Sequence, residues 1–255
     1  MPNVQLHLGY AGSGHLDPYS IVNDGQGICG GYAILMKYLL NQCGVEAEIV
    51  SNTGHAWNLV RIDGKWYHCD VTFGAGTGGD TMNSLSYILM DDATRQQSLE
   101  ASGMGGKKTV MGFGSIEDAP APACLDNRFR AYNDVGWCYT LDLDRQAVFF
   151  SGWEGIEMMD LNCTGRHIIL KDVFTCQMAC FGGDIYYVDI NDGHLYRVGS
   201  DGEPELVDCG GEITDLKVKN ATLTYAFDKT GASRSMSICR ACRMHKRPLR
   251  VNYRI

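Results

Sequence analysis

Apolar residues recur every three or four positions between residues 29 and 43, which is the spacing of one face of an α-helix. The stripe consists of Tyr32, Leu35, Met36, Leu39, Leu40 and Cys43. Gly44 follows it, and glycine commonly ends a helix because it enters the left-handed backbone region at little steric cost. The Gly-rich stretch 24–28 precedes it and permits a sharp turn. The pattern therefore predicts a helix with Cys29 at or near its N-terminus.

Three strand-like runs rich in Val, Ile, Trp and Tyr follow this helix, at 46–51, 55–62 and 65–72. Asp63-Gly64 separates the last two runs, and this dipeptide between alternating runs favours a two-residue hairpin turn. Such a turn pairs Ile62 with Lys65, and counting back from that pair gives the register of the whole hairpin.

This register places His55 and Asp70 on one face of the hairpin as diagonal neighbours whose side chains can meet. Trp57 lies opposite Asp70 in the same register. Asn58 falls on the other face, which disfavours it as a partner of His55, and His68 shares the face of Asp70 farther along. The hairpin therefore offers a His-Asp pair near one end.

From about residue 138 the pattern changes to short β-like segments separated by Gly-rich turns. These segments repeat at an offset of 37: Phe149-Phe150 returns as Tyr186-Tyr187, and Thr164-Gly165 as Asp201-Gly202, with a looser third copy through Thr224-Tyr225. Units of about 40 residues with several strands resemble propeller blades, each of which needs neighbours to bury its face. The alternative is an ordinary meander with chance similarity.

The two patterns together predict an α+β domain over residues 1–130 and a small all-β repeat domain over residues 131–255. The stretch 115–122 contains two of the six prolines and is the expected connection between them.

Composition narrows the classes of partner. The 255 residues carry a net charge of −8, and the basic clusters are short, so nucleic acid is not an expected partner. No apolar run approaches the roughly 18 residues of a membrane span, and the first residues lack the pattern of a secretion signal. A cytoplasmic location is expected, or an exported one if a signal precedes the sequence given.

The eleven cysteines are an odd number without a compact spacing, which favours reduced thiols that are mostly buried. Cys239 and Cys242 with His245 have metal-like spacing but supply three ligands and no second cysteine pair. A zinc site there is an open alternative, but the expectation is no metal and no cofactor.

Cys29 is the exception among the thiols, because only a thiolate is a strong nucleophile and this residue has two groups that favour one. The positive end of its helix stabilises the anion, and an imidazolium at His55 would form an ion pair with it. Asp70 would accept a hydrogen bond from the far ring nitrogen of that imidazole. An oxyanion hole would use the backbone N–H of Cys29 with a side-chain donor, Gln26 or Trp57.

Three blocks of sequence, GICGGYA at 27–33, GHAWNLV at 54–60 and DGKWYHCDVTF at 63–73, closely resemble the core of the bacterial transglutaminase-like superfamily. The resemblance covers roughly residues 20–130 and implies a papain-like α+β fold with Cys29, His55 and Asp70 as its triad. Phe73 departs from the tryptophan that the family often has there. The C-terminal repeats resemble units found beside such cores.

The leading functional expectation is an enzyme that forms a thioester at Cys29 with an amide carbonyl of a peptide or protein. A peptidase or amidohydrolase comes first, because water needs no second binding site. A transglutaminase or a glutamine deamidase is the first alternative. The second is an inactive binding or scaffold protein whose β repeats contact a protein partner.

Overall fold

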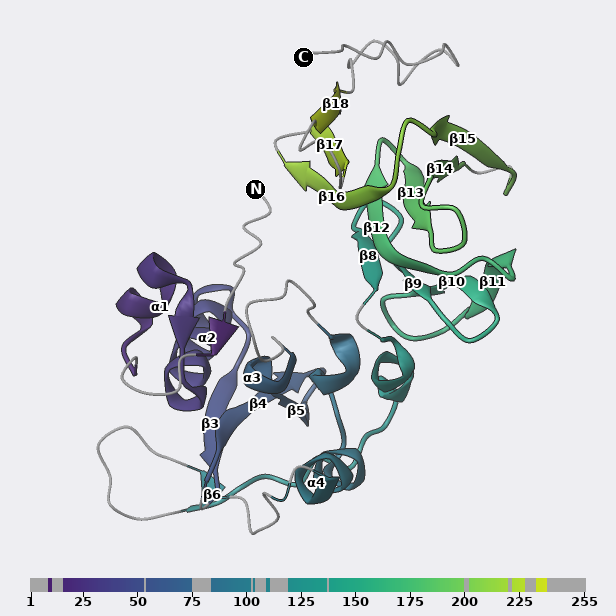
Figure 1. The fold of residues 1–255 in the computed structure, drawn as a ribbon. Coiled ribbons are helices and arrows are strands. Elements are labelled where there is room, and N and C mark those ends of the chain that lie inside the picture. The colour runs from purple at the N-terminus through teal and green to yellow at the C-terminus, as the bar shows by residue number, and fades with distance from the viewer. Residues whose placement is uncertain are drawn as a thin grey trace. The chain divides into compact units, whose positions relative to one another are not determined.

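The computed structural model describes residues 9–10, 16–52, 54–74, 84–101, 103, 109–110, 119–136, 138–199, 202–219, 222–227 and 233–237. The chain divides into two compact units, Asn3–Trp137 and Cys138–Ile255. Figure 1 shows helices gathered in the first unit and strands in the second. An α+β core followed by small antiparallel sheets is thus confirmed.

The first unit is built on a five-stranded sheet with the order β5-β4-β3-β6-β7. Its strands are β3 (Ala47–Ser51), β4 (Ala56–Ile62), β5 (Lys65–Cys69), β6 (Thr109–Val110) and β7 (Ala119–Pro120), all paired antiparallel. A parallel pair, β1 (Gly9–Tyr10) and β2 (Gln26–Gly27), lies outside this sheet. The helices are α1 (Pro18–Asp24), α2 (Cys29–Gln42), α3 (Val71–Gly74) and α4 (Asp92–Ala101), with 3-10 turns η1 (Leu85–Tyr87) and η2 (Arg130–Asp134).

Helix α2 begins at Cys29, as the periodicity predicts, and Gly44 beyond its end has a φ of 76°. No side chain caps its N-terminus, where Ile28 is the N-cap residue. The helix buries Tyr32 and Leu35 against Ile21 of α1. The first N–H groups of α2 are therefore not satisfied by a capping side chain at the point where Cys29 stands.

The predicted hairpin register is confirmed, because Ile62 pairs with Lys65 across a turn in which Asp63 and Gly64 have φ of 50° and 78°. The prediction that the second strand continues to Thr72 is wrong. The strand ends at Cys69, and the N–H of Phe73 donates to Asp70 Oδ1 (3.0 Å) as α3 begins. A short polar side chain that satisfies a backbone N–H in this way favours the start of a helix.

The two faces of this sheet have different coverings. The face with Val60 and Cys69 packs against Met36 and Leu40 of α2. The face with Trp57 and Leu59 packs against Leu99 of α4 and against Cys124. Asn58 belongs to the first face, where its Nδ2 donates to the backbone oxygen of Ala33 (2.9 Å). The face of Trp57 also carries His68 and Asp70, so α4 covers the His-Asp region of the hairpin.

The second unit consists of three antiparallel sheets met in chain order. The first contains β8 (Tyr139–Asp142), β9 (Ala147–Ser151), β10 (Gly155–Asp160) and β11 (His167–Lys171). The second contains β12 (Thr175–Phe181), β13 (Asp184–Asp189), β14 (Leu195–Val198) and β15 (Pro204–Asp208). The third contains β16 (Ile213–Lys219), β17 (Thr222–Phe227) and β18 (Ser233–Ser237).

Each sheet buries its face against the next, as repeat units do. Phe149 and Ile156 of the first sheet pack with Ile185 and Tyr187 of the second. A further apolar cluster joins the second and third sheets through Tyr186, Leu195, Leu223 and Tyr225. Phe149, Tyr186 and Leu223 are spaced by 37 residues and are all buried. The β repeats inferred from that offset are therefore confirmed.

The stretch 115–122 does not behave as a connection where the structure describes it. Ala119 and Pro120 form β7 and pair with β6 inside the first unit. The boundary between the units instead falls after residue 137. Pro120 is tolerated because β7 is an edge strand with one hydrogen-bonded neighbour.

Candidate active site

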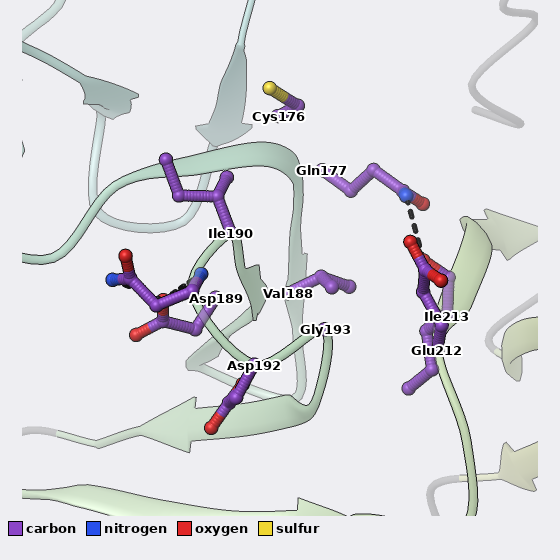
Figure 2. Close-up of a pocket in the computed structure, with 10 residues that line it drawn as sticks. Cys176, Gln177, Val188, Asp189, Ile190, Asp192, Gly193, Glu212 and Ile213 are labelled. Atoms are coloured by element: carbon purple, nitrogen blue, oxygen red, sulfur yellow. Dashed lines mark hydrogen bonds between the residues drawn. The ribbon is translucent and has the colours of Figure 1, made fainter.

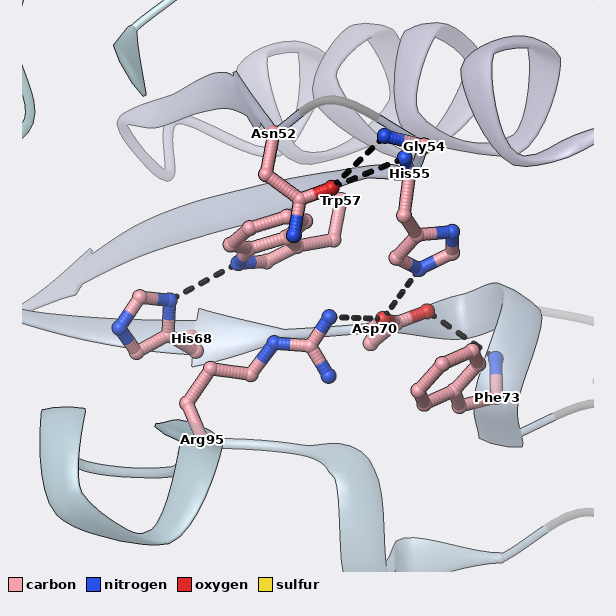
Figure 3. Close-up of polar contacts among 8 residues, drawn as sticks. All are labelled: Asn52, Gly54, His55, Trp57, His68, Asp70, Phe73 and Arg95. Carbon is pink, nitrogen blue, oxygen red and sulfur yellow. Dashed lines mark hydrogen bonds and ion pairs between the residues drawn. The ribbon is translucent and has the colours of Figure 1, made fainter. Parts of the chain in front are cut away.

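His55 and Asp70 meet at the end of the hairpin, as the predicted register requires. His55 Nε2 donates to Asp70 Oδ2 over 2.6 Å, and both side chains are buried (Figure 3). A carboxylate only accepts, so this bond places a proton on Nε2. The Oδ1 atom of Asn52 accepts the backbone N–H of His55 (3.0 Å) and holds the turn that leads into the strand. Asn52 thus fixes the backbone of His55, and Asp70 fixes the orientation of its ring.

Cys29, at the first position of α2, is the third member of the group. A hydrogen bond with His55 lowers the pKa of the Cys29 thiol, against the opposing effect of burial, and the backbone N–H groups of Ala56 and Gly30 lower it further. Burial opposes the charge on His55, but hydrogen bonds to Asp70 and Cys29 outweigh it and raise the pKa of His55 to about 9. Both shifts favour a thiolate and an imidazolium at neutral pH.

Two aromatic rings hold the imidazole from its sides. Phe73 stacks on it with ring centroids 4.7 Å apart, and Trp57 lies at 5.8 Å in a nearly parallel plane. Phe73 therefore contacts the His55 ring directly, at the position where the resembled family often has a tryptophan. The two rings restrict the imidazole to rotation within a narrow slot.

Arg95 is the residue of this site that the sequence did not reveal. It lies on α4, is 1% exposed, and its Nη2 forms an ion pair with Asp70 Oδ2 at 2.8 Å (Figure 3). Its guanidinium also lies 4.3 Å from the ring centre of Trp57. The only signal in the sequence would have been an arginine three positions after Asp92 on a short helix, which is a common surface pattern.

The Trp57 side chain is not available as an oxyanion donor in this structure. Its Nε1–H donates to His68 Nδ1 (2.9 Å), and the residue is buried, so its one polar hydrogen is already engaged. Gln26 lies in β2, and its side chain falls outside the described residues. The backbone N–H groups of Gly30 and Ala56, which already donate toward the sulfur, are the donors that the described residues place beside Cys29.

His68, Asp92 and Cys124 form a cluster whose ligand atoms all lie within 4.8 Å of one another. His68 Nε2 donates to Asp92 Oδ1 (2.9 Å), and the N–H of Cys124 donates to Asp92 Oδ2 (3.0 Å). Because Trp57 donates to Nδ1, the proton of neutral His68 sits on Nε2, the atom that a metal would need. The cluster therefore fits a hydrogen-bonded network better than a metal centre. Cys239, Cys242 and His245, the other metal alternative, lie outside the described residues.

The second unit contains a cavity of about 480 Å³ beside the β13–β14 turn (Figure 2). Its walls include Cys176, Gln177 and three acidic residues, Asp189, Asp192 and Glu212. The residues that line it include no histidine, so it does not combine a thiol with a base. A thiol, an imidazole and a carboxylate come together in the first unit, at Cys29, His55 and Asp70.

The comparison with family models gives a match within the first unit. Residues 3–71, which include Cys29, His55 and Asp70, match the model of the transglutaminase-like superfamily. No curated protein matches the chain. Within the part of the chain that the structure describes, no helix is long and apolar enough to cross a membrane.

Solved structures resemble the chain weakly. BamB from Moraxella catarrhalis is 22% identical over 35% of this chain and 28% of its own, with a TM-score of 0.27. A chain of the nidogen/laminin complex is 11% identical over 75% and 74%, with a TM-score of 0.35. A protein of unknown function from Bacteroides thetaiotaomicron is 9% identical over 74% and 55%, with a TM-score of 0.34. This chain thus spans less than a third of the length of BamB. The description of the fold rests on the strands and sheets given above.

The family match is to a group of proteins that includes cysteine-based enzymes, and it falls on the segment that supplies the thiol, the imidazole and the carboxylate. Residues 3–71 therefore form a transglutaminase-like segment, and the resemblance inferred from the sequence is confirmed there.

Proposed function

We propose that the first unit is a thiol hydrolase that cleaves amide bonds of peptides or proteins through a thioester at Cys29. The observation that carries the proposal is His55, which is hydrogen-bonded to Asp70 and to the Cys29 thiol and has its pKa raised to about 9. A histidine in a structural role has no need of a thiol partner whose own pKa is lowered.

The proposed reaction begins when the Cys29 thiolate attacks the amide carbonyl carbon. The resulting oxyanion collapses, the carbon–nitrogen bond breaks, and the His55 imidazolium gives its proton to the departing amine. A water molecule then loses a proton to neutral His55 and attacks the thioester, and the acid product leaves as the Cys29 thiolate and the imidazolium are restored. Asp70 keeps the imidazole in one orientation and stabilises its charged form in both stages.

Hydrolysis is preferred over transamidation because water requires no binding site of its own. A primary amine in place of water would make the same thioester a transglutaminase intermediate, and a glutamine side chain in place of a peptide bond would make the reaction a deamidation. Product analysis with a glutamine-containing peptide, with and without a fluorescent primary amine, separates the three. A shorter peptide indicates a peptidase, ammonia without an amine conjugate indicates a deamidase, and ammonia together with an amine conjugate indicates a transglutaminase.

The first test is the rate at which iodoacetamide labels Cys29 from pH 4 to pH 9, read by peptide mapping. We expect rapid labelling already at pH 6 in the native chain and a loss of about tenfold or more in His55→Ala at that pH. Cys43 and Cys176 are exposed thiols of the same chain and serve as internal controls. If Cys29 is labelled no faster than these two and ignores the substitution, the thiol is not activated and an inactive binding protein becomes the better proposal.

A further inference from the structure

Asp70 is shared between two cationic side chains. Its Oδ2 atom accepts from His55 Nε2 at 2.6 Å and lies 2.8 Å from Arg95 Nη2, while Oδ1 accepts the N–H of Phe73. The Asp70 side chain is fully buried, and the side chain of Arg95 is 2% exposed. An arginine so deeply buried is rare, because removing its charge from water is costly unless a partner compensates.

The same two rings contact both cations. Trp57 and Phe73 flank the imidazole of His55, and the guanidinium of Arg95 lies 4.3 Å from the Trp57 ring centre and 5.2 Å from that of Phe73. A planar guanidinium packs against aromatic faces in a way that a lysine ammonium does not. The orientation of Arg95 and the slot that holds His55 therefore depend on one set of contacts.

Other charged or titratable groups near Asp70 and His55 come from the neighbouring elements. Cys29 approaches His55 from α2 and lowers the free energy of its charged form. Tyr87 of η1 interacts electrostatically with Arg95. His68 of β5 and Asp92 of α4 are bonded to each other behind Trp57. Of the groups named here, Arg95 is the cation that contacts Asp70 in addition to His55.

We propose that Arg95 is a positioning residue for the Cys29, His55 and Asp70 site. It fixes the Asp70 carboxylate between two cations and limits how strongly that carboxylate stabilises the imidazolium form of His55. This inference rests on the proposed function, in which His55 must release its proton to a departing amine. A carboxylate with no second cation would bind the imidazolium more tightly and make it a weaker acid.

The test compares Arg95→Met and Arg95→Lys with the native chain. The His55 Cε1–H signal is followed by NMR through a pH titration, with His55→Ala used to assign it, and hydrolysis of a peptide 4-nitroanilide, whose amine leaving group requires a proton, is measured in parallel. We expect Arg95→Met to raise the pKa of His55 by about one unit, because a cation beside Asp70 is lost. Arg95→Lys keeps the charge, so the titration should stay within about 0.3 units, while turnover falls several-fold because the planar contacts are lost.

Arg61→Met is the matched control. Arg61 also lies near a tryptophan ring, at 5.9 Å from Trp66, and also pairs with a carboxylate, Glu46 at 2.9 Å, but this ion pair is exposed. The Arg61→Met substitution should change neither the pKa of His55 nor the turnover.

A folded Arg95→Met variant with the native His55 titration would overturn the inference. Should that variant not fold, Arg95→Lys decides, since native turnover there would exclude a positioning role for the guanidinium. A native chain whose His55 titrates near 6.5 and whose Cys29 reacts slowly would instead contradict the proposed function itself.

Discussion

Buried carboxylates have different partners in the two units. In the second unit Asp142, Glu157 and Asp208 are buried, and each pairs with an arginine whose side chain remains 32–38% exposed. In the first unit Asp70 pairs with Arg95, which is almost completely buried, and with His55. The carboxylates Asp142 and Asp208 also accept backbone N–H groups at the ends of strands, as turn residues do.

The difference separates charges that stabilise a turn from charges that, in the proposed function, take part in a reaction. Arginines that still reach water lose little hydration, so the pairs of the second unit need only modest compensation. The Asp70 network removes two full charges and an imidazole from water, and this arrangement is favourable only if each group stays partnered. Such a cluster beside a half-buried thiol is typical of a catalytic site.

The largest effect should come from neutralising the central carboxylate. Asp70→Asn leaves Arg95 buried without its counter-charge, and we expect a loss of about 3–5 kcal/mol in the free energy of unfolding. Hydrolysis of the peptide 4-nitroanilide should fall by about 100-fold or more, because the imidazolium loses the group that orients and stabilises it. Urea unfolding of the full chain and steady-state hydrolysis measure the two losses.

Asp208→Asn is the matched variant in the second unit. Asp208 accepts from Tyr225 Oη (2.7 Å) and pairs with Arg234, which can turn to water when the charge is lost. We expect it to cost about 1–2 kcal/mol and to leave hydrolysis unchanged. Equal costs for the two variants would show that the burial of the arginine partner does not set the penalty.

A second comparison uses the pH dependence of thiol labelling in the two units, where we expect an effect of intermediate size. Hydrogen bonding to His55 lowers the pKa of Cys29, whereas burial and then Asp142 raise the pKa of Cys180 to about 11. Raising the pH from 7 to 9 increases a thiolate population tenfold per unit only while the pH is below the pKa. Iodoacetamide labelling of Cys180 should therefore rise about 100-fold over this range, and that of Cys29 should rise by a smaller factor because its pKa is lowered. A parallel rise at both thiols would contradict the ion pair.

The smallest effect should come from the network behind the site. Trp57→Phe keeps an aromatic ring beside His55 and removes the N–H that donates to His68. His68 Nδ1 loses this buried hydrogen bond, so we expect a loss of about 1–3 kcal/mol in the free energy of unfolding. Cys29 labelling at pH 6 should change by less than about threefold. A much larger fall in labelling would show that Trp57 acts on the thiol directly.

The predicted elements that proved accurate are those encoded by neighbouring residues. The apolar period of α2 places Cys29 at a helix start, and the Asp63-Gly64 turn brings His55 to Asp70. The sequence prediction failed at Asp70 itself, where a strand ends and α3 begins. There the competing interaction is a side chain that accepts a backbone N–H three residues later, a contact that β propensity does not represent.

The amino-acid sequence by itself therefore determined the helix, the hairpin, the 37-residue repeat and the pairing of His55 with Asp70, because turn geometry and side-chain period act over a few residues. Only the tertiary structure decided that Arg95 joins Asp70 and that Trp57 donates to His68. The contact with Arg95 depends on how α4 packs on the sheet, and burial of a charge is a property of that packing rather than of any local pattern.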